Sequence, residues 1–268
     1  MHLRLARSAH CTARKLCASL QPPAHGRNFA SWRPQNLGTT RSLWHRLKNG
    51  GGDDYVVPGL IAMNGVVFIG WYIGRDNRFI RRYMMDNFTM IPHHVLDHPF
   101  RYGHTLFTSM FSHSDFWHCF ANMFTLYFFG SSSVAFLGAT RFLGLYVCSG
   151  MFSSVSYLTW ASMSKQQRRG GNGYGRRGSN MSYFSPVLGA SGAINGIVLH
   201  NVATFPKAMV MIYGIVPMPA AVFGLLYVLK DAYEFQTGTG GNTANIAHLG
   251  GAAVGLMYFL LRKGRGRF

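Results

Sequence analysis

The chain has 268 residues, of which 48% are hydrophobic and only 13% are charged. Soluble globular proteins carry about 25% charged residues, so this composition argues against a soluble globule. The charge is also unbalanced, because 26 lysines and arginines face 8 acidic residues, which gives a formal net charge of +18 at pH 7. The basic residues lie in tails and loops around long apolar runs, and this distribution favours a membrane protein over a nucleic-acid-binding protein.

The N-terminal stretch, residues 1–52, contains many arginines and no acidic residue. An arginine-rich N-terminus without acids and without a long apolar core is typical of an organelle transit peptide and not of a secretory signal. Residues 27–31 resemble a mitochondrial processing site that is cut after Phe29. We therefore predict a transit peptide over residues 1–29 and a basic segment over residues 30–54, with a disordered basic tail as the alternative.

Six apolar segments follow, and several approach the roughly 20 residues that a helix needs to cross a bilayer. They cover residues 55–74, 113–131, 142–163, 186–204, 208–229 and 243–261. Pro217 and Pro219 are expected to break or begin the fifth helix. No segment alternates like a barrel strand, so helices must satisfy the backbone in lipid. The predicted fold is an all-α membrane protein: a bundle of six transmembrane helices in one domain, residues 55–262, with a basic tail over 263–268.

The connections between these segments differ in composition. Residues 75–112 are aromatic-rich and mixed in charge, which predicts a long but ordered loop. Residues 164–185 are rich in Gly, Arg and Asn, which predicts a flexible loop before the fourth helix. The four cysteines show no CxxC pair, and the histidines of the first loop lack the helical spacing of metal ligands. We therefore expect no disulfide framework, no metal site and no cofactor.

Three groups of polar residues interrupt the apolar segments, where polar side chains are costly and usually face a cavity or one another. They are centred on His118 and Asn122 in the second segment, on Ser191 in the fourth and on His248 in the sixth. His118 and Asn122 are four residues apart and therefore share one helix face, with His113 just before them. The three groups are candidates for one shared site.

These residue types together suit nucleophilic catalysis. A serine hydroxyl is a poor nucleophile until a base takes its proton, and histidine is suited to that task near neutral pH. A tetrahedral oxyanion needs donors already in place, which His118 and Asn122 can supply alongside a backbone N–H. Each motif alone has a plainer explanation, since GxSG occurs by chance and small residues pack membrane helices. The combination predicts Ser191 as nucleophile and His248 as general base.

From about residue 55 to residue 262 the sequence resembles the rhomboid family of intramembrane proteases. The resemblance rests on an HxxxxHxxxN string, a GxSG string and an AHxxGxxxG string, in this order along the second, fourth and sixth segments. The matched residues are His113, His118, Asn122, Gly189, Ser191, Gly192, Ala247, His248, Gly251 and Gly255. Arg101 matches the arginine of the family's first loop, although Phe100 stands where a tryptophan is common.

The resemblance implies a role for each matched side chain at the reaction centre. Ser191 would attack the scissile carbonyl, while His248 would take its proton and return it to the leaving amine. The Ser191 backbone N–H, His118 and Asn122 would hold the oxyanion. The family works with this Ser–His dyad, so a third, acidic member is not required.

Two further positions follow from the same resemblance. Gly251 and Gly255 would let the sixth helix approach the fourth and bring His248 within reach of the serine. Asn195 stands where some bacterial relatives have a tyrosine that stacks on the catalytic histidine, so His248 must be oriented in another way.

Three acids could complete a triad, and we interpret each as an interfacial or loop charge. They are Asp115, Asp231 and Glu234.

The function implied is hydrolysis of single-span membrane proteins within the lipid bilayer, with no nucleic-acid partner. A non-catalytic membrane chaperone or degradation adaptor is the alternative, although inactive relatives lack the serine or the histidine. A transporter is a third candidate, which the absence of inverted repeats and of an intramembrane acid disfavours. The basic N-terminus predicts a multi-pass protein of the mitochondrial inner membrane with both ends in the matrix, and a plastid membrane is the alternative.

Overall fold

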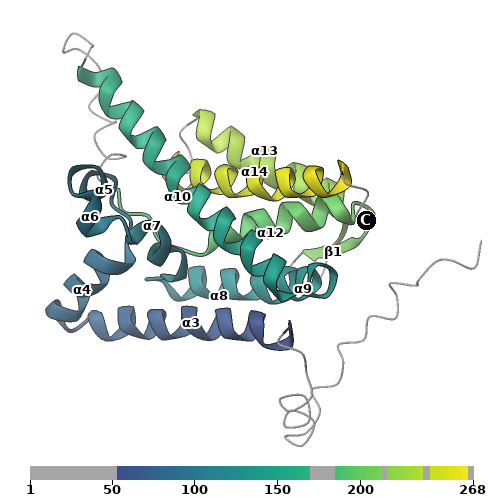
Figure 1. The fold of residues 1–268 in the computed structure, drawn as a ribbon, viewed down its shortest axis with the longest axis horizontal. Coiled ribbons are helices and arrows are strands. Elements are labelled where there is room, and N and C mark those ends of the chain that lie inside the picture. Colours follow the sequence, from purple (N-terminus) through teal and green to yellow (C-terminus); the bar gives the residue numbers. More distant parts are fainter. Residues whose placement is uncertain (1–52, 170–184, 213–215, 238–241, 265–268) are drawn as a thin grey trace, which may run out of the picture. The chain divides into compact units, whose positions relative to one another are not determined.

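The computed structural model describes residues 53–169, 185–212, 216–237 and 242–264. The predicted transit peptide and its processing site lie outside the described residues, as does most of the 164–185 loop. The described residues belong to one compact unit, Leu47–Phe268. This unit is mostly helical (Figure 1).

The first half of the unit begins and ends with long helices. The elements are α3 (Asp53–Gly74), α4 (Arg78–Phe88), α5 (Pro92–Asp97), α6 (Pro99–Tyr102), α7 (Thr105–Thr108), the 3₁₀ turn η2 (Ser109–Phe111), α8 (Phe116–Thr125), the π-helical turn η3 (Leu126–Gly130), α9 (Ser131–Leu137) and α10 (Ala139–Arg169). The first loop predicted between the first two apolar segments is thus a chain of short helices. Asn77 caps α4, the first helix of this series, because its side chain accepts hydrogen bonds from the N–H groups of Phe79 and Ile80.

The second half contains three helices and a small hairpin. The elements are α12 (Ser191–Thr204), β1 (Met209–Ile212), β2 (Val216–Pro219), α13 (Ala220–Thr237) and α14 (Asn242–Gly264). The prediction of a helix over 208–229 is wrong in its first half, because β1 and β2 pair there as antiparallel strands. Proline lacks the N–H that a helix needs and is tolerated in a sheet only at an edge. Pro217 and Pro219 both lie in β2, and α13 begins directly after Pro219.

Four helical stretches of the described residues are long and apolar enough to cross a membrane. They are Asp53–Gly74, Phe116–Leu137, Ala139–Met163 and Ala244–Gly264. α12 has only 14 residues, which corresponds to about 21 Å of helix, against about 30 Å of hydrocarbon. The chain is therefore a mostly helical membrane protein with several spans, in which α12 is too short to cross alone.

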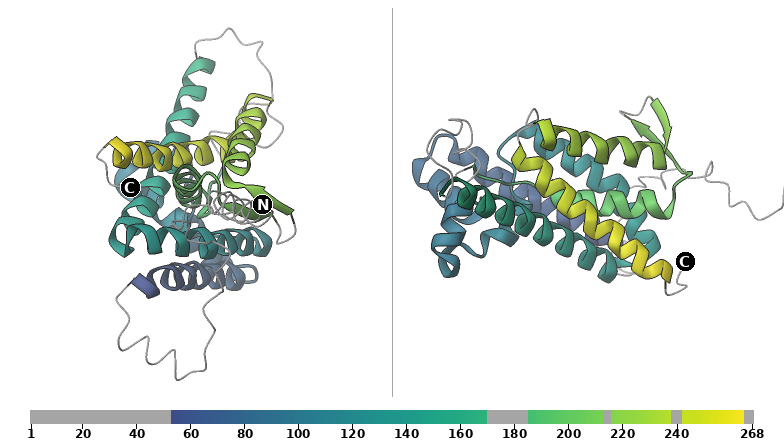
Figure 2. Two further views of the ribbon diagram at one scale, coloured as in Figure 1. Left: turned by 90° about the vertical axis from the view of Figure 1, so that its right-hand side faces the viewer. Right: turned by 90° about the horizontal axis from the view of Figure 1, so that it is seen from above.

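α12 lies inside the bundle, with α3 on one side of it and α13 and α14 on the other (Figures 1 and 2). Its residues 192–202 are all buried, and it packs mainly against α14 and α10. A helix whose apolar residues lie on all sides is expected in such a central position. The surrounding helices therefore shelter the shortest helix of the bundle.

Glycines allow α12 and α14 to touch backbone to backbone. A Cβ placed on Gly251 would lie 1.9 Å from the carbonyl oxygen of Gly192, and a Cβ on Gly255 would lie 1.9 Å from that of Gly196. Small residues are the usual means by which membrane helices approach so closely. α10 completes the seam, since the Ser153 hydroxyl lies 2.0 Å from the Cβ position of Gly192.

Candidate active site

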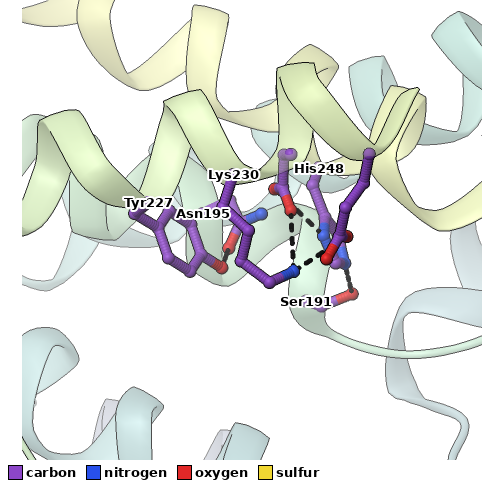
Figure 3. A network of polar contacts seen from close by, with 7 residues as sticks. Ser191, Asn195, Tyr227, Lys230 and His248 are labelled. Carbon is purple, nitrogen blue, oxygen red and sulfur yellow. Dashed lines mark hydrogen bonds and ion pairs between the residues drawn. The ribbon is translucent and has the colours of Figure 1, made fainter. Parts of the chain in front are cut away.

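The structure brings Ser191 and His248 into contact, although 57 residues separate them in the chain. Ser191 is the first residue of α12, and His248 lies on the first half of α14. The imidazole Nε2 of His248 is 2.9 Å from the hydroxyl oxygen of Ser191 (Figure 3). Both side chains are half-buried. This is the distance at which a nucleophile and its base exchange a proton.

The backbone seam between the two helices lies next to this pair. Gly192, whose carbonyl approaches Gly251, directly follows Ser191 in the chain. Gly251 comes three residues after His248, which is about one helical turn. Because two backbones touch there, helix packing fixes how far apart the main chains of the serine and the histidine lie.

The segment before Ser191 is held by hydrogen bonds from the first loop. Val187 pairs with Met90 through two backbone hydrogen bonds of 2.9 Å, and the Gly189 N–H donates to the carbonyl of Ser109. The Ala190 N–H donates to Nε2 of the buried His113 at 3.3 Å. His113 therefore supports the residues that lead into the serine and does not itself contact Ser191.

Gly189 occupies a position that few other residues could take. Its φ is +130°, a backbone conformation that L-residues with a side chain rarely adopt. A Cβ there would lie 2.9 Å from Cε1 of His118 and 3.8 Å from the Ser191 hydroxyl oxygen. The imidazole of His118 and the serine hydroxyl thus flank the same glycine.

α8 positions His118 and Asn122. The Asp115 carboxylate caps this helix by accepting the N–H of His118 at 2.9 Å. Asn122 is buried, and one N–H of its amide donates to the carbonyl oxygen of His118 at 2.8 Å. The imidazoles of His113 and His118 meet edge to face, with ring centroids 5.1 Å apart. The two predicted oxyanion donors therefore occupy one turn of α8, beside the segment that precedes the serine.

Arg101 lies away from this cluster. It is exposed on α6, and its guanidinium stands 5.3 Å from the ring centre of Tyr102. No contact between described residues joins it to Ser191 or His248. Likewise, no group of three or more His, Cys, Asp or Glu side chains in the described part of the chain is placed to hold a metal ion.

α13 contributes polar residues that the sequence reading did not assign to the site. The Asp231 carboxylate oxygen Oδ2 is 3.3 Å from Nδ1 of His248, and the Asp231 side chain is only 5% exposed. The interpretation of Asp231 as an interfacial or loop charge is therefore wrong. One turn earlier, the Tyr227 hydroxyl donates to the side-chain oxygen of Asn195 (Figure 3). The four-residue spacing of Tyr227 and Asp231 places both on one face of α13, and this spacing was the signal that could have revealed the face.

The other two acids have partners other than His248. Glu234 accepts a hydrogen bond from the exposed Lys230 at 2.9 Å, and the Lys230 ammonium is 3.7 Å from the second carboxylate oxygen of Asp231. Asp115 serves as the helix cap described above. Of the three acids considered from the sequence, only Asp231 faces the imidazole of His248.

The fold and this cluster define the class of protein. A model of the rhomboid domain matches residues 101–264, which include all three motifs and more than half of the chain. The chain belongs to the rhomboid family, which confirms the resemblance inferred from its motifs.

The chain is similar to several mitochondrial members of this family. It is 37% identical over 235 residues to RHOMBOID-like protein 12, mitochondrial, of Arabidopsis thaliana, which covers 86% of this chain and 66% of that protein. It is 31% identical over 237 residues to the human presenilin-associated rhomboid-like protein, mitochondrial (85% and 54%). It is 27% identical over 206 residues to rhomboid protein 1, mitochondrial, of Saccharomyces cerevisiae (76% and 52%). The chain thus spans between about half and two-thirds of the length of these relatives.

Proposed function

We propose that this chain is an intramembrane serine endopeptidase that cleaves single-span membrane proteins. The observation that carries the proposal is the 2.9 Å contact between Nε2 of His248 and the hydroxyl oxygen of Ser191. A serine in a membrane helix needs no such partner for packing, whereas a nucleophile needs a base within hydrogen-bond reach. Family membership supports the same assignment, since the two residues occupy the family's motifs.

In the proposed mechanism, Ser191 attacks the carbonyl carbon of the scissile peptide bond while its proton passes to Nε2 of His248. The oxyanion accepts hydrogen bonds from the Ser191 backbone N–H and from the side chains of His118 and Asn122. The N–H at the start of α12 suits this role, because the first N–H groups of a helix have no partner within it. His248 then protonates the leaving amine, and a water molecule deprotonated by His248 hydrolyses the acyl-enzyme.

The length of α12 supports catalysis within the membrane. We propose that α12 and α13 complete a six-helix bundle with the four stretches long enough to span. If the far end of an untilted α12 reaches one membrane face, Ser191 lies about 9 Å inside the opposite face of the hydrocarbon layer. The non-helical segment 185–190 connects directly to Ser191. A substrate helix would have to unwind there to expose its backbone to Ser191.

The proposed location is the mitochondrial inner membrane. Its support is the basic, acid-free stretch before Asp53 and the mitochondrial names of the relatives, although a chloroplastic relative is also similar. N-terminal sequencing of the protein from isolated organelles tests this. A mature start at Ala30 is expected, while an intact Met1 or accumulation in plastids would contradict the proposal.

Cleavage by paired variants tests the enzymatic assignment. Full-length protein is reconstituted in liposomes with a model single-span substrate, and the wild type is compared with Ser191→Ala, His248→Ala and the double variant. Each single variant should accumulate normally and lose cleavage, and the double variant should be hardly worse, because members of a catalytic unit are not additive. Near-wild-type cleavage by either single variant would rule out the dyad. Substrate binding without cleavage by the wild type would favour the adaptor function.

A further inference from the structure

Asp231 is the one acid of α13 that points into the bundle. Its side chain is 5% exposed, and that of Glu234, three residues later, is 24% exposed. Glu234 is paired with Lys230, an exposed residue at the surface of the helix. The helix therefore turns one carboxylate toward the surface and the other toward His248.

A buried carboxylate is costly unless charged or polar groups compensate it. The two oxygens of Asp231 face different groups: Oδ2 lies 3.3 Å from Nδ1 of His248, and Oδ1 lies 3.7 Å from the Lys230 ammonium. Lys230 is 60% exposed, so water screens that pair. The imidazole is consequently the partner that accounts for the position of Asp231.

The opposite edge of the imidazole touches the nucleophile. Nε2 of His248 is bound to the Ser191 hydroxyl, which leaves Nδ1 directed at the carboxylate. The 3.3 Å contact is not aligned as a hydrogen bond. Hydrogen bonds between catalytic residues are often long or poorly aligned before substrate binds, and they tighten in the complex. Serine, histidine and carboxylate thus form one row across α12, α14 and α13.

The neighbouring turn holds α13 against α12. The Tyr227 hydroxyl donates to the side-chain oxygen of Asn195; Tyr227 precedes Asp231 by four residues, and Asn195 follows Ser191 by four. Residues four apart lie on the same helix face. This second contact helps to hold α13 in the rotation that directs Asp231 at the imidazole.

We propose that Asp231 is a positioning residue that orients His248 for catalysis; the inference rests on the proposed function. By accepting the Nδ1–H, the carboxylate keeps the neutral imidazole in the tautomer whose Nε2 lone pair can take the serine proton. It then stabilises the imidazolium, while the proton stays on Nε2 until it passes to the leaving amine. The proton does not pass on to the carboxylate, as in serine hydrolases that use three residues.

Asp231→Asn tests this role because it keeps the size of the side chain and removes its charge. The full-length protein in liposomes is assayed for cleavage of the model substrate, with active sites counted by a fluorophosphonate. We expect kcat per active site to fall by at least about tenfold. The fall should be smaller than the roughly 10⁴-fold loss that the same substitution causes in a Ser-His-Asp protease. KM should stay within about twofold, because Asp231 does not touch the substrate.

Glu234→Gln is the matched control, since it neutralises a carboxylate on the same helix that pairs with Lys230 and not with His248. Its kcat should stay within twofold of the wild type. If Asp231→Asn does not accumulate, Asp231→Glu and Asp231→Gln are compared, because they differ only in charge; the Glu form should be the faster.

The possible results separate the two claims. Loss of cleavage and labelling in Ser191→Ala, together with a kcat near wild type in Asp231→Asn, would overturn the role of Asp231 alone. Equal rates for the Glu and Gln forms would do the same. A Ser191→Ala variant as active as the wild type would overturn the proposed function itself.

Discussion

The two sides of Ser191 are built in different ways. On the α14 side, backbone meets backbone: Gly251 and Gly255 leave no room for a Cβ against the carbonyls of α12. On the α8 side, side chains meet the loop before the serine: His118 lies beside Gly189, and Asn122 bonds to its own helix. Rigid packing therefore positions the backbone that carries the base, whereas the proposed oxyanion donors approach the serine only through their side chains.

This difference has a physical consequence for catalysis. Proton transfer from Ser191 to His248 tolerates little change in distance, and two helices in backbone contact can hardly shift. Oxyanion donors act instead through hydrogen bonds to a group that exists only during the reaction, and they must be in place before that group forms. Substitutions on the α14 side should thus act through geometry, and those on the α8 side through lost hydrogen bonds.

The largest effect is expected at the seam. In Gly251→Ala, the new methyl group would lie 1.9 Å from the carbonyl oxygen of Gly192, so α14 must move away and carry His248 with it. We expect cleavage to fall below detection and the free energy of unfolding to drop by at least about 1–3 kcal/mol. Cleavage assays and thermal unfolding in detergent measure the two quantities.

Gly144→Ala is the control for this variant. Gly144 lies within α10, and a Cβ at this position would meet no atom within 4 Å. Its activity should match the wild type, and helix propensity should raise stability by at most about 1 kcal/mol. Equal behaviour of Gly144→Ala and Gly251→Ala would remove the distinction between the two sides.

A smaller effect is expected on the α8 side. Removing one oxyanion donor typically lowers kcat by about 10²–10³-fold. Asn122→Ala should therefore weaken cleavage without abolishing it, and His118→Ala should be at least as harmful. Single-turnover rates on the reconstituted enzyme give the comparison. If both variants cleave at the wild-type rate, the α8 residues are structural and the oxyanion is held elsewhere.

The smallest effect is expected at the outer contact between α12 and α13. Tyr227→Phe removes the hydroxyl that donates to Asn195 and leaves the ring in place. The net value of such a bond is about 0.5–1.5 kcal/mol, so stability should fall by that amount and kcat only a few-fold. A loss of cleavage as large as that in Gly251→Ala would show that α13 is coupled to Ser191 and His248 as rigidly as α14 is.

The three motifs and the face of α13 differ in how far the sequence predicted them. The family and the helical membrane fold follow from three motifs because these motifs combine unusual polar residues with fixed spacing in apolar segments. The position of Asp231 could not be predicted in this way. A charge on an apolar helix has the same appearance in sequence whether it faces solvent or a buried imidazole, and only the rotation of α13 decides between them.

The β1–β2 hairpin was missed for a related reason. Residues 209–219 are apolar enough to continue a membrane helix, and the two prolines were expected to break or begin it. Pairing of Met209 with Pro219 and of Met211 with Pro217 is a tertiary outcome that residue composition does not determine. The helix start at Ala220, in contrast, follows from proline chemistry alone.

Covalent labelling of the serine tests the central claim most directly. The full-length protein in liposomes is treated with a fluorophosphonate, and the modified peptide is identified by mass spectrometry. We expect one labelled residue, Ser191, with no label in Ser191→Ala and strongly slowed labelling in His248→Ala, because the probe reports a serine activated by its base. Labelling of another serine, or an undiminished rate in His248→Ala, would contradict it.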